Sequence, residues 1–482
     1  MSESDKQKEL TGKYDQIKKF GEIERYNEEM PKKDFIFPLF EANHRRNLGV
    51  HLTSVSIFNQ YILPKIENKI NEYIWVDLFA GEGNLILPIL NKVPENERLE
   101  FFKQNIFLFD IQERMVSKSI ENAALYGIPE QIAKKNIILK DTLNEFPIFL
   151  KNMDKPVYHI TNPPYLYIGY IAKHRENSNQ LKYFSGTNKG LQDLYQLALM
   201  NDLRNSIKNM IYIIPSNFLF GHSVSNLVRK SFLKDYTIKE AIIFEKKIFE
   251  NTGTNVAICF FEREKGMNKV INFDAVKINS EISRRKYTLT EENNFRAGQE
   301  FEEYVKKNKK NVLNIKYYLK KQELDKNLGD NKLILLDSKE YKNGKYTKRV
   351  FFVNDNLYRK IRANPLFIRT VDTGSENGKV GLYFINEVFG TDGIYVDGST
   401  YRTNPIQAFI EPTLSKEQLN DVRVIFNRTL NNLRNETDGE FMTTYKYSDH
   451  GKYTRKYLGL SQARDLLETI NIFNIKNTQE TL

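Results

Sequence analysis

Seven short runs of β-branched and aromatic residues dominate the first 265 residues of this 482-residue chain. They span residues 74–79, 105–110, 136–140, 156–161, 209–214, 239–244 and 255–262. The first five alternate with amphipathic stretches such as residues 113–126 and 191–205, which is the spacing of βαβ units. This alternation predicts a mostly parallel sheet covered by helices. The last two runs lie close together and predict an antiparallel hairpin.

The length of the chain exceeds what one hydrophobic core usually supports, so we expect more than one domain. The seven runs predict an α/β domain over residues 41–265 with a seven-stranded sheet. Residues 1–40 are polar and charged and predict an N-terminal extension. Residues 266–482 combine a charged stretch, Gly-rich strand-like pieces over 373–404 and helical sequence from 416 onward. This second part predicts a separate α+β region.

The composition excludes several classes of protein. No apolar run approaches the roughly 20 residues of a membrane span, and the first forty residues lack the apolar segment of a secretory signal. The single cysteine, Cys259, lies in an apolar run and cannot form an internal disulfide. Six histidines and one cysteine give no credible zinc site. We therefore expect a cytoplasmic protein that binds neither a membrane nor a metal.

The charge of the chain favours a polyanionic partner. Lys and Arg total 72 against 61 Asp and Glu, a net charge of +11. Residues 271–482 contain 35 basic and 28 acidic residues, so this part alone carries +7. A basic surplus is typical of nucleic-acid-binding proteins, although it also serves solubility.

A glycine-containing turn follows the first predicted strand. Asp77 ends that strand, and Ala80, Gly81 and Gly83 lead into the apolar residues 85–90, for which we expect a helix. Glycines at such a turn let the backbone approach a ligand at a helix N-terminus. The strand before and the helix after give this pattern more weight than two glycines alone.

Polar side chains also end the next three strands. Asp110 ends the second, where a carboxylate could accept both hydroxyls of a ribose or simply cap a helix. Asp141 and Thr142 end the third, where a carboxylate could accept an adenine amine. Asn162 ends the fourth. Because the carboxyl ends of parallel strands share one edge of a sheet, these residues predict a nucleoside site there.

The tetrapeptide Asn162-Pro163-Pro164-Tyr165 carries the most specific chemistry. The asparagine offers a side-chain carbonyl, and proline restricts the backbone so that the carbonyl of Pro163 has a fixed direction. Two acceptors then face one point, beside an aromatic ring. This arrangement suits a planar exocyclic amine such as N6 of adenine.

These motifs resemble, in order, those of the amino-methyltransferases of DNA restriction–modification systems, which use S-adenosylmethionine. The resemblance covers residues 45–262: residues 47–53 look like motif X, 77–83 motif I, Asp110 motif II, Asp141 motif III and 162–165 motif IV, the γ order. Asp193-Leu-Tyr195 and residues 214–217 match later elements. Residues 249–258 resemble motif VIII, whose phenylalanine stacks on the extruded adenine; we prefer Phe249, with Phe244 as the alternative.

The resemblance implies a Rossmann-like S-adenosylmethionine-dependent methyltransferase domain followed by a C-terminal target-recognition region. It assigns catalysis to Asn162, Pro163, Pro164, Tyr165 and Phe249. It assigns cofactor binding to Thr53, Asp77, Ala80, Gly81, Gly83, Asp110, Ile111, Asp141, Thr142 and Asn162.

The activity implied is methyl transfer to N6 of a flipped-out adenine in double-stranded DNA. We expect a monomer that acts as a free-standing modification enzyme, since no nuclease motif is evident. A separate cognate restriction endonuclease acting on the same site is the protein partner that the resemblance allows, and the sequence leaves its existence open. Two basic–aromatic clusters, residues 341–349 and 445–457, are candidates for DNA contact. Two alternatives stay open: adenine in RNA or a protein glutamine amide as the substrate, and a non-catalytic DNA-binding subunit.

Overall fold

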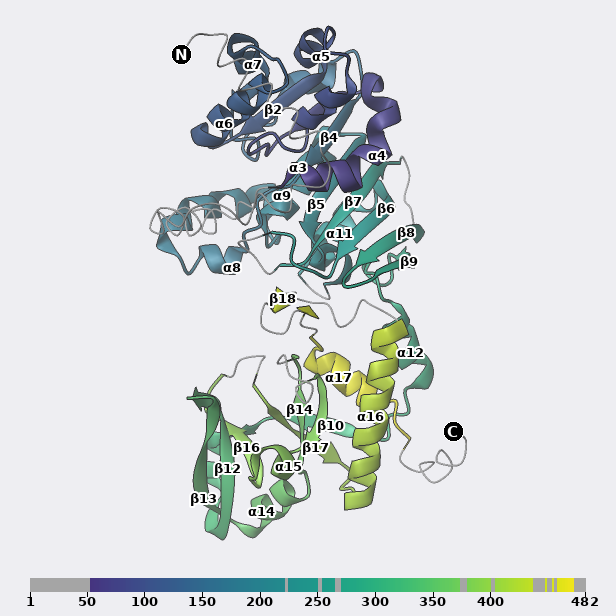
Figure 1. The fold of residues 1–482 in the computed structure, drawn as a ribbon. Coiled ribbons are helices and arrows are strands. Elements are labelled where there is room, and N and C mark those ends of the chain that lie inside the picture. Colours follow the sequence, from purple (N-terminus) through teal and green to yellow (C-terminus); the bar gives the residue numbers. More distant parts are fainter. Residues whose placement is uncertain are drawn as a thin grey trace. The chain divides into compact units, whose positions relative to one another are not determined.

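The computed structural model describes residues 53–221, 224–249, 254–264, 270–372, 379–399, 404–436, 447–448, 453–454 and 457–471. Its first part is built on one nine-stranded sheet (Figure 1). The strands are β1 (Ile74–Asp77), β2 (Ile106–Asp110), β3 (Ile137–Leu139), β4 (Val157–Thr161), β5 (Asn209–Pro215), β6 (Tyr236–Phe244), β7 (Val256–Arg263), β8 (Val270–Ile278) and β9 (Ile282–Thr290). The predicted extension over residues 1–40 lies outside the described residues.

The strand order is β3-β2-β1-β4-β5-β7-β6-β8-β9. The five strands from β3 to β5 are all parallel. The chain builds outward from β1 to β3 on one side and then continues on the other side with β4. The strand order therefore reverses between β1 and β4, and such a switch point leaves a crevice at the carboxyl ends of the two strands.

All seven predicted strands are present, and the antiparallel pairing of β6 with β7 is confirmed. The predicted number of strands is wrong, because β8 pairs parallel with β6 and β9 adds antiparallel to β8. The strand β8 is covered on one face only, since its residues alternate between exposed and buried along most of its length. The first half of β9 has no buried residue. The exposed residues of both strands are mostly polar or charged, such as Asn272 and Asp274 in β8 and Arg284 and Lys286 in β9, and these residues disguised the strands in the sequence. The sheet therefore continues past residue 265, and its hydrophobic core extends to Ala297.

Helices connect the strands much as the amphipathic stretches predicted. The α-helices of this part are α3 (Val55–Ile57), α4 (Leu63–Ile66), α5 (Arg98–Asn105), α6 (Glu113–Ala124), α7 (Glu130–Asn136), α8 (Ile168–Ile171), α9 (Leu194–Asn205), α10 (Asn217–Phe220) and α11 (Asn226–Phe232). The expected helix at residues 85–90 is the 3-10 helix η4 (Leu87–Lys92). Pro88 lies within it and donates no backbone hydrogen bond. No helix in the described ranges is both long and apolar enough to cross a bilayer.

The C-terminal part contains two four-stranded sheets, β10-β17-β14-β15 and β11-β16-β12-β13. The strands are β10 (Asn314–Tyr317), β11 (Leu319–Lys320), β12 (Leu328–Lys342), β13 (Lys345–Val353), β14 (Leu366–Arg369), β15 (Gly381–Phe384), β16 (Gly393–Val396) and β17 (Ile406–Glu411). The helices are α12 (Glu300–Asn308), α13 (Lys321–Lys326), α14 (Asp355–Arg362), α15 (Ile385–Phe389), α16 (Lys416–Glu436) and α17 (Leu460–Leu467).

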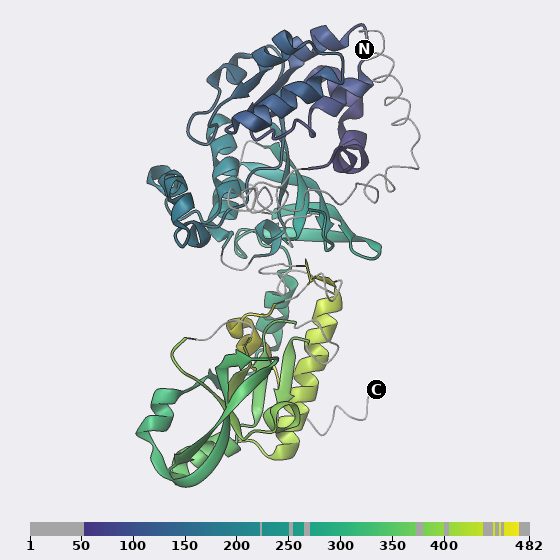
Figure 2. The same cartoon turned by 60° about the vertical axis from the view of Figure 1, so that its left-hand side comes forward.

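The long helix α16 confirms the helical sequence predicted from residue 416 onward. Its apolar residues Val422, Phe426 and Leu430 share a core with strand residues such as Ile368 and Leu382. The helix α16 runs alongside the sheet β10-β17-β14-β15 (Figures 1 and 2). This core begins at Phe301 and is distinct from the core of the nine-stranded sheet. The division of the chain into a catalytic and a recognition domain stays a prediction.

Arg229 on α11 is fully buried and is held by backbone carbonyls. Its guanidinium donates to the carbonyls of Phe218 and Gly221 at 2.7 Å and of Asn294 at 2.9 Å. We expect Arg229→Met to lower the free energy of unfolding by about 2–4 kcal/mol, because these buried acceptors lose their donor. Urea unfolding checks this result. The neighbouring exposed Lys230→Met is the control, and an equal effect of both substitutions would contradict the assignment.

Candidate active site

The carboxyl edge of the sheet at the switch point brings the predicted site residues together. Asp77 and Asp110 end the adjacent strands β1 and β2, and Asn162 follows β4 on the other side of β1. Side chains from the intervening loops connect these positions by hydrogen bonds. The sequence-based prediction that these polar residues share one sheet edge is thus confirmed by the strand order.

Asp77 is almost completely buried and organises the end of β1. Its Oδ1 accepts hydrogen bonds from the backbone N–H of Phe79 at 2.9 Å and from the hydroxyl of Thr161 at 2.5 Å. Burial raises the pKa of Asp77 from 3.8 to about 6, although His159 and the two hydrogen bonds act in the opposite direction. Asp77 therefore joins the end of β1 to the end of β4 from inside the sheet.

The glycine turn lies against Asp110. Gly81 and Gly83 have φ angles of +55° and +81°, a region that glycine adopts readily. The backbone N–H of Gly81 donates to Asp110 Oδ2 at 2.9 Å, and that of Gln112 donates to Oδ1 at 2.8 Å. A Cβ on Gly83 would lie 2.7 Å from atoms of Leu87 and Ser119, so this turn has no space for a side chain.

The backbone of Ile111 also contributes a hydrogen bond to the carboxylate of Asp110. Burial raises the pKa of Asp110, and the backbone hydrogen bonds oppose this shift. The next residue, Ile111, is 58% exposed, which is unusual for a large apolar side chain beside a buried carboxyl group. The carboxylate of Asp110 is thus a hydrogen-bond acceptor, and the side chain of Ile111 forms an apolar surface next to it.

Thr142 and Asp141 have different surroundings at the end of β3. The buried hydroxyl of Thr142 donates to the carbonyl of Leu78 at 2.7 Å and so ties this loop to the loop after β1. Asp141 is partly exposed, and its Oδ2 accepts a hydrogen bond from the hydroxyl of Tyr183 at 2.6 Å. The structure therefore gives Thr142 a structural contact and leaves Asp141 accessible at the edge.

The amide of Asn162 is held on both sides. Its Nδ2 donates to the hydroxyl of Thr53 at 2.9 Å, and its Oδ1 accepts a hydrogen bond from the hydroxyl of Tyr165. The carbonyl of Thr53 in turn accepts a bond from Asn84 Nδ2 at 3.0 Å. The remainder of the predicted motif X, residues 47–52, lies outside the described residues.

Tyr165 is 9% exposed, and its ring packs edge-on against Tyr195. Its hydroxyl also lies 2.6 Å from the carbonyl of Ile213. Burial raises the pKa of Tyr165 well above its usual value, and the nearby Asp193 raises it further, so the hydroxyl is a hydrogen-bond donor. Because it carries one proton, it donates to one of its two acceptors at a time.

The two candidate stacking rings, Phe249 and Phe244, are both buried. Phe249 is 4% exposed, and residues 250–253 of the predicted motif VIII lie outside the described residues. Phe244 is completely covered, and its ring packs edge-on against Tyr61 with centroids 5.1 Å apart. This packing occupies Phe244 inside the core. The role of Phe249 stays a prediction.

A buried chain of polar side chains supports the site and was missed in the sequence. The backbone N–H of Leu78 donates to His159 Nε2 at 3.2 Å, and His159 Nδ1 lies 2.6 Å from Asp202 Oδ2. The hydroxyl of Tyr212 donates to the same oxygen at 2.6 Å. His159 is the single basic residue of the strand β4, and this position was the available signal, whereas Asp202 lies among the polar residues Asn201, Arg204 and Asn205 of α9 and gave none. No group of three or more metal-binding side chains occurs within the described ranges.

Asp77 should make folding pH-dependent. Its folded-state pKa of about 6 lies above the ordinary 3.8, so the native state binds the proton more tightly and this group's contribution to stability falls as the pH rises from about 4 to 6. The Asp77→Asn variant has no carboxyl group at this position, so it does not lose stability in this way as the pH rises. We expect the free energy of unfolding of the variant, relative to wild type, to increase by about 2 kcal/mol between pH 4 and pH 7. Urea unfolding at both pH values measures it, and a pH-independent difference would contradict the assignment.

The sequence matches the family described as N-6 DNA methylase over residues 36–349. No curated protein matches the chain. Solved structures that resemble it include a type I restriction-modification methyltransferase subunit from Streptococcus thermophilus, at 18% identity and a TM-score of 0.32, covering 46% of this chain and 45% of that one.

Two further solved structures resemble this chain at similarly low sequence identity. The type I restriction enzyme EcoKI M protein has 14% identity and a TM-score of 0.33, with 46% of this chain and 49% of that chain covered. The type IIG restriction endonuclease BpuSI has 13% identity and a TM-score of 0.42, with 89% and 61% covered. The chain thus spans about half the length of the two type I proteins. Because the family match covers more than half of the sequence, the chain belongs to the N-6 DNA methylase family.

Proposed function

We propose that this protein transfers a methyl group from S-adenosylmethionine to N6 of an adenine in double-stranded DNA, as the modification enzyme of a restriction–modification system. Family membership supports the reaction class. The observation that carries the proposal is the amide of Asn162, held at the switch point between Thr53 and Tyr165. A side chain fixed in this way is suited to orient a small planar amine.

The residues at the sheet edge fit the cofactor. The carboxylate of Asp110, held by backbone donors, suits the two ribose hydroxyls, and the exposed side chain of Ile111 offers an apolar surface for the adenine. Asp141 would accept the ring amine, and Gly81 lets the backbone approach. Thr53 would lie toward the methionine end. When bound, S-adenosylmethionine supplies an electrophilic methyl group on its sulfonium.

The target amine would be oriented by two acceptors. The Oδ1 of Asn162 is a side-chain carbonyl oxygen, which can accept more than one hydrogen bond, and the carbonyl of Pro163 would supply the other acceptor. Both would draw the N–H bonds of the adenine amine out of the ring plane, which localises the nitrogen lone pair for attack. No base is needed before the transfer, because the proton leaves the nitrogen afterwards. Positioning then accounts for most of the acceleration.

The reacting base would have to leave the duplex, since its amine is inaccessible within the stack. Tyr165 and Phe249 are the aromatic residues that we assign to the flipped base. In the structure the hydroxyl of Tyr165 orients the amide of Asn162. Tyr165 would therefore serve both as an aromatic wall and as a support for the acceptor.

A basic and aromatic hollow in the C-terminal part supports contact with DNA. It has a volume of about 760 Å³ and includes most of the first predicted cluster. Three aromatic and three basic side chains form much of its wall: Tyr341, Tyr346, Phe389, Lys345, Lys348 and Arg369. The acidic residue of this wall, Asp372, pairs with Arg434 at 2.7 Å and is thereby neutralised. Such a surface fits the phosphates and sugars of a nucleic acid.

The second predicted cluster, residues 445–457, lies mostly outside the described residues. Residues Tyr447–Ser448 and Tyr453–Thr454 within it form the short antiparallel pair β18 and β19. We propose that this cluster also contacts DNA. Its contact residues are not assigned individually.

Asn162→Ala should lower the turnover number by about 10² or more at saturating cofactor and DNA, because an acceptor fixed for the reacting amine is removed. Transfer from radiolabelled cofactor to duplex DNA measures the effect. The exposed Asn152→Ala is a matched control and should methylate at the wild-type rate. An unchanged rate in Asn162→Ala would refute its role, and offering RNA and protein substrates in parallel would reveal a different substrate. A wild-type protein that methylates none of the three would support the non-catalytic alternative.

Lys345→Ala combined with Lys348→Ala should weaken binding to DNA of any sequence. The slope of log affinity against log salt should fall by about 1 for each phosphate that the protein no longer neutralises. Fluorescence anisotropy of a labelled duplex over a range of salt concentrations measures this slope. The control pair Lys332→Ala and Lys339→Ala removes the same charge from exposed positions of β12 outside the hollow. Equal reductions in both pairs would show that the hollow is not a specific DNA-binding surface.

A further inference from the structure

The segment that follows the catalytic motif reaches back to Asp141. It leaves Tyr165 and contains α8, the 3-10 helix η6 (Arg175–Phe184) and the short 3-10 helix η7 (Gly186–Asn188) before α9 begins (Figure 1). Its Tyr183 donates the hydroxyl hydrogen bond to Asp141 Oδ2 at 2.6 Å. The backbone N–H of Asn144 lies 3.2 Å from the other oxygen, Oδ1. Two donors therefore fix the plane of the Asp141 carboxylate.

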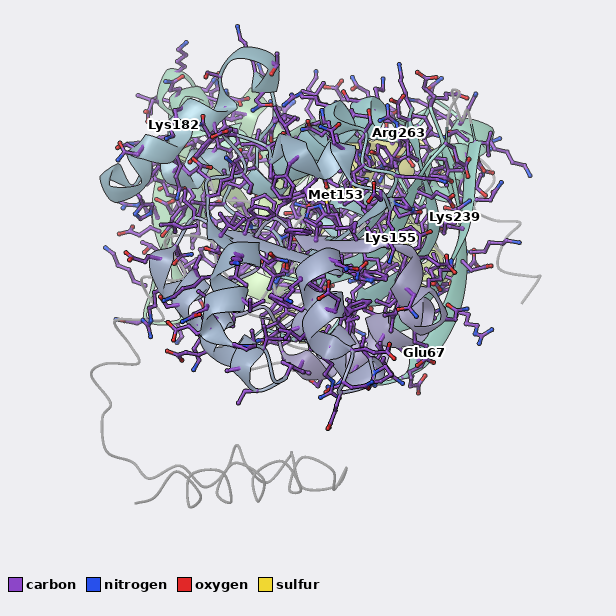
Figure 3. The ribbon with its side chains drawn as sticks, turned by 90° about the horizontal axis from the view of Figure 1, so that it is seen from above. Glu67, Met153, Lys155, Lys182, Lys239 and Arg263 are labelled. Atoms are coloured by element: carbon purple, nitrogen blue, oxygen red, sulfur yellow. The ribbon has the colours of Figure 1, made fainter. Side chains whose placement is uncertain are left out.

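Tyr183 is itself held firmly. Its carbonyl accepts a bond from Asn188 Nδ2 at 2.8 Å, and Asn188 Oδ1 accepts one from Arg204 on α9 at 2.7 Å. The next residue, Phe184, is buried in the core of the sheet domain. Lys182, by contrast, lies at the periphery in Figure 3, with its ammonium 5.0 Å from the centre of the Tyr183 ring. The segment is thus anchored on both sides of Tyr183.

The hydroxyl of Tyr183 acts as a hydrogen-bond donor. Burial raises the pKa of Tyr183, and the hydrogen bond to Asp141 raises it further. The proton therefore stays on the tyrosine, and Asp141 acts as the acceptor. Each oxygen of a carboxylate has two lone-pair sites, so one site remains beside each donor.

We propose that Tyr183 is a specificity-determining residue that acts through Asp141: it holds the carboxylate as an acceptor for the ring amine of the cofactor's adenine. This inference rests on the proposed function. Tyr183 lies in the segment after the catalytic motif, and it would select the base of the cofactor. A purine with an amine at this position donates to the free lone pair. A purine with a carbonyl there would place oxygen against oxygen.

The Asp141 acceptor should favour a purine with an amine over one with a carbonyl at this position. A site built to accept a hydrogen bond rejects an analogue that cannot donate, because the site's polar group is left unpaired. Without the Tyr183 hydroxyl, the carboxylate can rotate and the preference for an amine weakens. The aromatic ring of phenylalanine would preserve the packing of the segment. Removing the hydroxyl therefore isolates the hydrogen bond.

The test compares two ligands by isothermal titration calorimetry with the full chain. S-adenosylhomocysteine carries the ring amine, and S-inosylhomocysteine carries a carbonyl oxygen in its place. For Tyr183→Phe we expect the Kd of the adenosyl ligand to rise about fivefold, because a hydrogen bond that orients a charged group is removed. The Kd of the inosyl ligand should change less than twofold. Asp141→Asn should abolish the effect of the tyrosine substitution in a double-mutant cycle.

Tyr167→Phe is the matched control, since it removes an exposed hydroxyl from the same segment. It should leave both Kd values unchanged. Equal weakening for the two ligands in Tyr183→Phe, tighter binding of the adenosyl ligand, or additivity with Asp141→Asn would each overturn the inference. Those results are distinct from a failure of the proposed function: a protein that does not use S-adenosylmethionine would bind neither ligand, and one that methylates RNA or protein instead of DNA would still discriminate between the two ligands.

Discussion

Parallel pairing between β1 and β4 is the constraint on which the arrangement of the site depends. These strands are separated by about eighty residues of sequence, and their pairing places Asp77 and Asn162 at one edge of the sheet. The chain leaves β1 toward β2 and leaves β4 toward β5, so the two connections diverge. The space between them is where a ligand can enter. A different strand order would scatter the same residues over the sheet.

The cost of burying polar groups at this edge is offset by a dense set of hydrogen bonds. Asp77 contacts Thr161, His159 contacts both the turn after β1 and Asp202, and Thr142 returns to the same turn. Each bond contributes modestly, but an unpaired buried group would cost considerably more. The loops therefore have few alternative arrangements, which is the condition that a positioned acceptor such as Asn162 requires.

Much of the fold could be predicted from the sequence because hydrophobic periodicity is a local property of the chain. The seven strands, the helices α6 and α9 and the helix α16 all follow from patterns within about twenty residues. The strands β8 and β9 were missed because their exposed residues are mostly polar or charged, which is typical of an irregular polar stretch. The hollow around Tyr346 and Phe389 was equally hidden. The centroids of those two rings lie 5.9 Å apart, although more than forty residues separate them in the chain.

The sequence by itself determined the chemistry at the ends of the strands: the glycine turn after Asp77, the carboxylates Asp110 and Asp141, and the acceptors of residues 162–165. These are short motifs whose residue types express their chemistry directly. Only the tertiary structure decided how those groups are held. The bonds from Asn162 to Thr53, from Tyr183 to Asp141 and from Leu78 to His159 join residues that are distant in the chain and meet at the edge of the sheet. The hydroxyl, amide and imidazole groups involved occur throughout the sequence, and no local pattern distinguishes those that meet from those that face solvent.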